Sequence, residues 1–159
     1  MPALQKKRHS QRGGAAVEFA FVFPILFLLM YGVVVYSYMF VLQESLNFAA
    51  QEAAEAAVAV DPDRNVTPDY NNQVEVHVRS TAQAVLGWLP EAQKQRVLGA
   101  DGAKVSVVFG TTDVAPATDT VTVTLTYDLQ GLFPVLSMYL VGDVPPMPQT
   151  LRAQAVVRI

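Results

Sequence analysis

The chain has 159 residues, of which 52% are hydrophobic and only 16% charged, whereas a typical soluble domain carries about 25% charged residues. The apolar excess is concentrated in Phe19–Leu42, where no side chain is charged, and this run excludes an ordinary soluble cytosolic protein. The high hydrophobic content argues against disorder of the whole chain, and the absence of cysteine excludes disulfides, zinc–thiolate sites and thiol catalysis.

Charge is distributed unevenly along the chain. Residues 1–13 contain Lys6, Lys7, Arg8 and Arg12 and no acid, so the net charge of −3 leaves −7 for the remainder. A basic start before an apolar run predicts a single-pass protein of the inner (cytoplasmic) membrane, with a cytoplasmic N-terminus and an extracytoplasmic C-terminal part. The acidic balance argues against nucleic acid as a partner.

The apolar run is long enough to cross a membrane as one helix. Phe19–Leu42 has 24 residues, and a hydrocarbon core of about 30 Å needs roughly 20 helical residues. A secretory signal peptide has an apolar region of only about 7–15 residues, so the run favours an anchor in membrane lipid; cleavage in the following Ala-rich sequence is the alternative. Pro24 is expected to kink or locally open the helix.

The helical pattern continues beyond the apolar run. Gln43–Val60 consists almost entirely of strong helix formers and carries an amphipathic pattern. Asp61-Pro62 ends it, because proline disfavours the helical conformation in the residue before it. Counted from Ala15 to Val60, the helix is about 69 Å long at 1.5 Å per residue. Its stripe of small and apolar residues lets another backbone approach closely; the stripe comprises Leu46, Ala49, Ala50, Ala53, Ala57 and Val60.

Glu18 is the one ionisable group at the edge of the apolar run. Its position alone leaves two interpretations open. It is either an interfacial carboxylate that reaches water, or a functional group that needs a partner, because a charge near the membrane centre costs several kcal/mol.

The residues around Glu18 favour the second interpretation. The sequence RGGAAVEFA (residues 12–20) resembles the processing site of type IV prepilins, where a membrane peptidase cuts after a glycine and the mature chain has Glu at its fifth position. Cleavage after Gly13 gives this register, whereas cleavage after the adjacent Gly14 breaks it. Residues 11–57 closely resemble the N-terminal half of TadE-like pseudopilins of the tight-adherence (Tad, or Flp) pilus system.

The resemblance gives Glu18 a role in assembly. It implies that this carboxylate meets the newly formed N-terminal amine of a neighbouring subunit in a bundle of helices. Opposite charges attract strongly in a low-dielectric environment, and each relieves the cost of burying the other. The implied partners are a prepilin peptidase, other pilins and pseudopilins, and the Tad assembly platform of the inner membrane.

The remainder predicts a small α+β domain in which a helix packs on a three- or four-stranded antiparallel sheet. Asp61–Asn72 is rich in Pro, Asp and Asn and is typical of a loop. The domain organisation is then a leader (1–13), a transmembrane and extended helix (14–60) and an extracytoplasmic head (61–159). The expected elements are a helix over 74–89, capped by Asn71 or Asn72, a short helix or turn over 91–98 ending at Gly99, and strands over 104–110, 120–129 and 150–159.

Three features of the predicted head each leave two interpretations open. The alternation in Val74–Val78 also fits the start of a strand, although the helical spacing is favoured. An apolar patch within Gly131–Gln149 either covers the sheet or meets a partner subunit, and the first is favoured. Trp88 is expected to be a core or cap aromatic residue rather than part of a ligand cage.

Residues for catalysis, cofactors or metals are missing from the sequence. His9 and His77 are the only histidines, and the common nucleotide-binding, nucleophile-elbow and zinc-protease motifs are absent. Asp61, Asp63 and Asn65 begin like a calcium loop, but Val66 stands where that loop needs Gly, and no Glu closes it. We therefore expect neither an enzyme nor a metal or cofactor site.

Together these observations predict a TadE-like minor pseudopilin, processed after Gly13 and required for biogenesis of a Tad/Flp type IV pilus. The sequence leaves open whether such a pilus serves adhesion, uptake or secretion. The alternative is an uncleaved single-span protein whose extracytoplasmic domain binds a ligand or an envelope partner.

Overall fold

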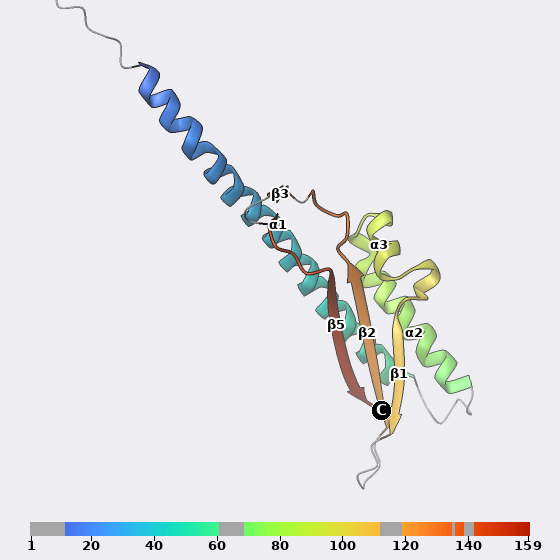
Figure 1. Ribbon diagram of the computed structural model, residues 1–159. Coiled ribbons are helices and arrows are strands. Elements are labelled where there is room, and N and C mark those ends of the chain that lie inside the picture. Colours follow the sequence, from blue (N-terminus) through green and yellow to red (C-terminus); the bar gives the residue numbers. More distant parts are fainter. Residues whose placement is uncertain (1–11, 61–68, 112–118, 135, 139–141) are drawn as a thin grey trace, which may run out of the picture. The chain divides into compact units, whose positions relative to one another are not determined.

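The computed structural model consists of a long N-terminal helix followed by helices and antiparallel strands (Figure 1). The α+β fold expected from the sequence is therefore confirmed. The chain divides into two compact units, Met1–Ser37 and Tyr38–Ile159, and the boundary falls inside the long helix. The structure describes residues 12–60, 69–111, 119–134, 136–138 and 142–159.

The long helix α1 contains 47 residues and continues through Pro24 without interruption. At 1.5 Å per residue it is about 70 Å long. Among the described residues, the other helical elements follow it in the chain and the five strands come after them. The elements are α1 (Arg12–Val58), α2 (Asp69–Val85), η2 (Leu86–Trp88), α3 (Glu91–Val97), η3 (Ala100–Gly102), β1 (Ser106–Thr111), β2 (Asp119–Asp128), β3 (Leu136–Met138), β4 (Gly142–Val144) and β5 (Thr150–Arg158).

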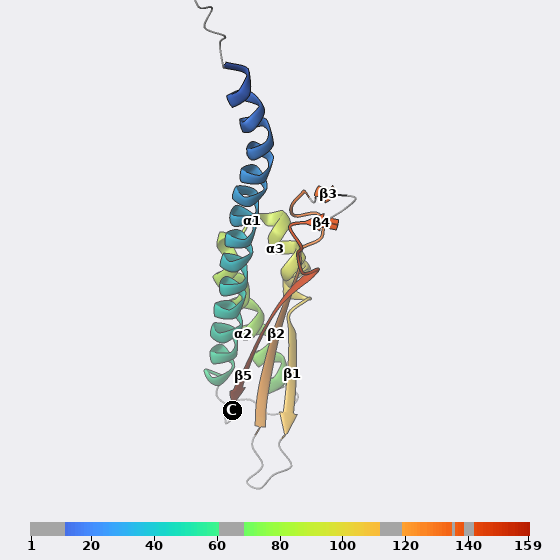
Figure 2. The same ribbon diagram turned by 60° about the vertical axis from the view of Figure 1, so that its left-hand side comes forward.

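The second unit is built on a three-stranded antiparallel sheet with the order β1-β2-β5. The central strand β2 alternates as its sequence predicts: Val121 pairs with Phe109 on one side and with Val157 on the other, and the inward side chains of β2 are fully buried. The threonines of β2 lie on the opposite face. Helices cover the face of this sheet that carries the inward side chains of β2 (Figure 2). A sheet covered on one face has apolar residues on that side of its strands.

The C-terminal half of α1 is part of the core of the second unit. Every residue of the predicted apolar stripe is buried, and the four alanines Ala49, Ala50, Ala53 and Ala57 are 0% exposed. This burial arises within a single chain, so the close approach that small side chains allow is made by the chain's own head. Gln43 also donates a hydrogen bond of 3.1 Å to the Arg152 carbonyl of β5.

The helix α2 confirms the helical interpretation of its sequence. Val74, Val78 and Ala82 are 0% exposed, as expected for one face of a helix. The prediction that Asn71 or Asn72 caps this helix is wrong, because α2 begins at Asp69 and both asparagines lie inside its first turn.

A tight corner connects α3 to β1. Gly99 has φ +69° directly after the helix, as the predicted helix stop requires, and Asp101 and Gly102 also have positive φ. A Cβ on Gly102 would stand 3.1 Å from Gln83 Nε2 and 3.2 Å from Arg79 Cβ. Glycine is therefore required at position 102 for both its backbone conformation and its small size.

The segment between β2 and β5 forms a separate two-stranded sheet from β3 and β4. Part of the predicted apolar patch, Val135 and Tyr139–Val141, lies outside the described residues. Its expected role in covering the sheet or meeting a partner therefore stays a prediction.

Candidate functional site

The N-terminal half of α1 carries a large uncovered apolar surface. Its bulky hydrophobic side chains are about half to three-quarters exposed, for example Phe21 at 74% and Ile25 at 70%. Among the described residues, α1 is the one helix long and apolar enough to cross a membrane. Such a surface is unfavourable in water and is stable only against lipid or other apolar helices.

The two glycines of the predicted processing site lie in the first turn of α1, which begins at Arg12. Around Gly14, no heavy atom lies within 4 Å of the position that a Cβ would occupy. Glycine is less favourable than alanine inside a helix by about 1 kcal/mol. Two adjacent glycines therefore make this turn easier to unwind than a turn of ordinary helix formers.

Glu18 lies on α1 in the second turn of the chain that cleavage after Gly13 would leave. Its side chain is exposed, and none of the side chains that the structure describes forms an ion pair with it. Within this single chain, the carboxylate is therefore accessible to a partner from another molecule.

A row of aromatic rings begins beside Glu18, and the sequence analysis missed it. Phe19, Phe23, Phe27 and Tyr31 follow one another at four-residue spacing, with ring centroids 5.5, 6.2 and 6.5 Å apart. Side chains four residues apart lie on the same face of a helix, so the spacing alone is enough to find this row. The row gives the N-terminal half of α1 one bulky, exposed face.

Two serine side chains of α1 are satisfied by hydrogen bonds within the helix. The Ser37 hydroxyl donates a hydrogen bond of 2.7 Å to the Val33 carbonyl. The Ser45 hydroxyl, one turn beyond the apolar run, donates in the same way to the Val41 carbonyl at 2.8 Å. In lipid there is no water to satisfy such groups, so these bonds suit a membrane segment.

The part of α1 that belongs to the second unit starts at Tyr38, which contacts the rest of that unit through both its ring and its hydroxyl. The Tyr38 hydroxyl donates a hydrogen bond of 2.9 Å to Gln93 Oε1 on α3. The Tyr38 ring also packs edge-to-face on Phe133, with centroids 5.5 Å apart. Tyr127 is fully buried nearby in the chain's core, and burial raises the pKa of its hydroxyl.

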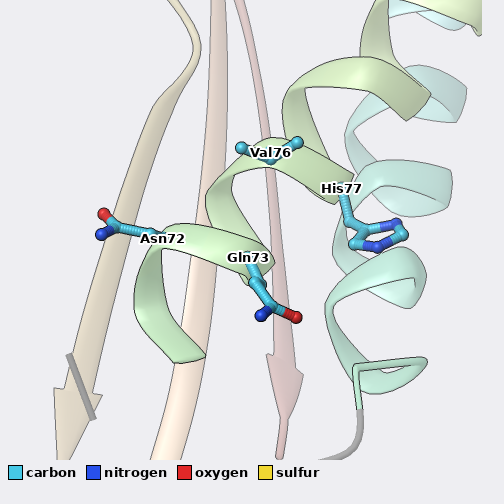
Figure 3. A pocket seen from close by; sticks show the side chains of 4 residues that line it. All are labelled: Asn72, Gln73, Val76 and His77. Carbon is cyan, nitrogen blue, oxygen red and sulfur yellow. The ribbon is translucent and has the colours of Figure 1, made fainter. Parts of the chain in front are cut away.

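The hollow along α2, among the described residues, does not bring catalytic side chains together. Its volume is about 330 Å³, and it is lined by Asn72, Gln73, Val76 and His77, all from α2. Figure 3 shows Asn72 and His77 pointing in different directions, so these side chains do not converge on a common point. Among the described residues, no three His, Cys, Asp or Glu side chains could hold a metal ion. The candidate calcium residues Asp61, Asp63 and Asn65 lie outside those residues, as does His9.

Of the two places expected for Trp88, the core or a cap, the structure excludes the core. Its side chain is 54% exposed, whereas its neighbours Leu86 and Leu89 are buried at 0% and 4%. The expectation of a core residue is therefore wrong, because these two leucines fill the apolar positions at the end of α2.

Comparison with protein families identifies the N-terminal helix. Residues 13–55 match the family model of TadE-like proteins, a segment that includes Gly13, Gly14, Glu18 and Pro24. Neither the curated proteins nor the solved structures gave a match. The matched segment ends within α1, so the fold of the remaining head rests on the structure alone. Over residues 13–55 this chain is similar to TadE-like proteins, which confirms the resemblance of its N-terminal sequence.

Proposed function

We propose that the chain is a minor pseudopilin, a structural and assembly subunit required for biogenesis of a Tad pilus. A prepilin peptidase removes residues 1–13, and α1 then anchors the mature subunit in the inner membrane. The head faces the extracytoplasmic side, because the basic leader is retained in the cytoplasm. The subunit has no catalytic activity of its own and works with other pilins and with the Tad assembly platform.

The observation that carries this proposal is the position of Glu18 on the uncovered half of α1. The small-residue stripe further along the helix is already buried by the chain's own head. The surface left for other pilin helices is therefore the N-terminal half, which carries Glu18 and the aromatic row. Contacts between subunits are formed there.

Glu18 supplies the polar attraction that this surface needs. Lipid tails are as apolar as the helix, so apolar contact alone drives helix association weakly in a membrane. An ion pair between Glu18 and the terminal amine of a neighbouring subunit adds a directional attraction. Removing one member of a buried pair typically costs about 3–5 kcal/mol, because the other charge is left buried alone. The amine exists only after cleavage, so processing precedes assembly.

Intact mass of the protein purified from membranes tests the processing step. In cells with an active prepilin peptidase, we expect the mass of a chain that begins at Gly14. A mass lower by one further glycine would move the cut to Gly14 and break the register of Glu18. A full-length chain under these conditions would contradict the proposal and favour the uncleaved single-span alternative.

The variant Glu18→Ala tests the assembly step. We expect cleavage to remain largely intact and piliation to be lost or strongly reduced. Glu44→Ala is the matched control, because Glu44 is an exposed carboxylate on the same helix but beyond the apolar run. Normal piliation by Glu18→Ala would remove the proposed role of this carboxylate, and equal defects in both variants would make the effect nonspecific.

A further inference from the structure

The end of the second unit that contains Tyr38 is defined by contacts within that unit. Tyr38 is its first residue, and its hydroxyl and ring contact Gln93 and Phe133. The C-terminus and the end of α1 lie at the opposite end of this unit (Figures 1 and 2). The chain therefore passes from the apolar segment into the head at the end where α3 lies.

The length of α1 between Phe19 and Tyr38 sets where Tyr38 lies relative to the hydrocarbon core of a membrane. Because α1 is continuous, the nineteen residue-to-residue steps from Phe19 to Tyr38 rise about 29 Å at 1.5 Å per residue. A hydrocarbon core is about 30 Å thick. A core that begins at Phe19, directly after Glu18, therefore ends at Tyr38. The headgroup layer then begins at the level where Gln93 and Phe133 meet the helix.

Exposed apolar side chains continue at this level. Phe40 and Val41, one turn or less beyond Tyr38, are 71% and 50% exposed. Trp88 is 54% exposed at the corner between α2 and α3, only five residues before Gln93. The indole ring combines a large apolar face with one N–H donor, a combination enriched where a membrane meets water.

From this arrangement we infer that the α2–α3 corner of the head rests in the headgroup layer of the membrane, with Trp88 in contact with lipid. The charges beside it are compatible with this place. Glu91 is paired with Lys94 at 3.0 Å, so the acid close to Trp88 is neutralised by its own neighbour. The head is thus held at the membrane by Trp88 in addition to α1. The inference requires the membrane span but neither the processing nor the role of Glu18.

Fluorescence of the purified chain in phosphatidylcholine vesicles tests this inference directly, because Trp88 is the single tryptophan. We expect a blue-shifted emission relative to a tryptophan in water. Lipids brominated near the headgroup should quench the emission more strongly than lipids brominated near the end of the acyl chain. No other protein is present, so a partner subunit cannot be the cause.

Two control variants move the tryptophan to exposed sites away from this corner. Trp88→Phe/Val76→Trp places it on α2, and Trp88→Phe/Val156→Trp places it on β5, where the native valines are 66% and 61% exposed. We expect bromine quenching of Trp88 to be several-fold stronger than that of either control, and acrylamide quenching to be weaker. If Trp88 is quenched by lipid bromines no more than the controls, the inference is wrong and the exposed indole is left for a protein partner.

Discussion

Replacing Leu46 by alanine tests whether α1 is a core element of the head or only a stalk. Leu46 is 1% exposed and lies four residues after Leu42, which is equally buried. Leu→Ala changes at buried sites cost about 2.7–5.0 kcal/mol, because both the transfer free energy and the contacts around the cavity are lost. For a unit of this size, 1 kcal/mol shifts Tm by roughly 4 °C, so a loss of about 3 kcal/mol lowers Tm by roughly 12 °C.

The assay is calorimetric unfolding of the full chain in detergent, with Phe48→Ala as the matched control. Phe48 is larger than Leu46 and only two residues away, but it is 53% exposed. Its removal should change the free energy of unfolding by no more than about 0.5 kcal/mol. Equal shifts in the two variants would refute the assignment of α1 to the core of the second unit.

Three further changes probe the head, each by the same unfolding assay. Gly102→Ala should destabilise the head by about 1–3 kcal/mol, because residue 102 has a positive φ that alanine adopts only with strain. The control Gly87→Ala, where no atom lies within 4 Å of the new Cβ, should cost less than about 1 kcal/mol. Equal costs in the two variants would contradict backbone strain at position 102. Tyr127→Phe should stabilise the head by about 1 kcal/mol, because the buried hydroxyl has no hydrogen-bond partner among the described residues, and a destabilised variant would reveal a missed partner. The hydrogen bond with Lys94 lowers the pKa of Glu91 below its ordinary value of 4.5. The ionised Glu91 side chain therefore adds a small amount to the stability of the head at neutral pH, and this amount is lost as the pH falls through the lowered pKa. The variant Glu91→Gln should lack this pH-dependent loss of stability.

Local periodicity made much of the fold predictable. The stripe from Leu46 to Val60 and the alternation of β2 each repeat at the spacing of one element, so the sequence alone identifies the buried face. The start of α2 was placed too late, because Pro68 and the polar residues after it are typical of a loop, yet Asp69 begins the helix. Polar residues are common both in loops and in the first turn of a helix.

The sequence alone does not show which part of the protein packs on a buried face. The spacing of Ala49, Ala50, Ala53 and Ala57 indicates a close contact, but the same pattern fits another subunit or the chain's own sheet. The structure assigns it to the chain's own head. The exposure of Trp88 depends in the same way on how α2 and α3 meet, which is set by contacts between distant residues. Gly13, Gly14 and Glu18 were singled out by the resemblance of residues 12–20 to a prepilin processing site, which needs no tertiary information, and their roles stay predictions.

The shared helix decides how a soluble fragment of this protein should be made. A fragment that starts at Asp61, where the predicted head begins, would lose Leu42, Leu46 and the alanines, and would leave the inner face of its sheet open to water. Such a fragment should aggregate. One that starts at Tyr38 keeps the helix that closes this face and omits most of the apolar run. Crystallisation and binding work on the head should therefore begin at Tyr38.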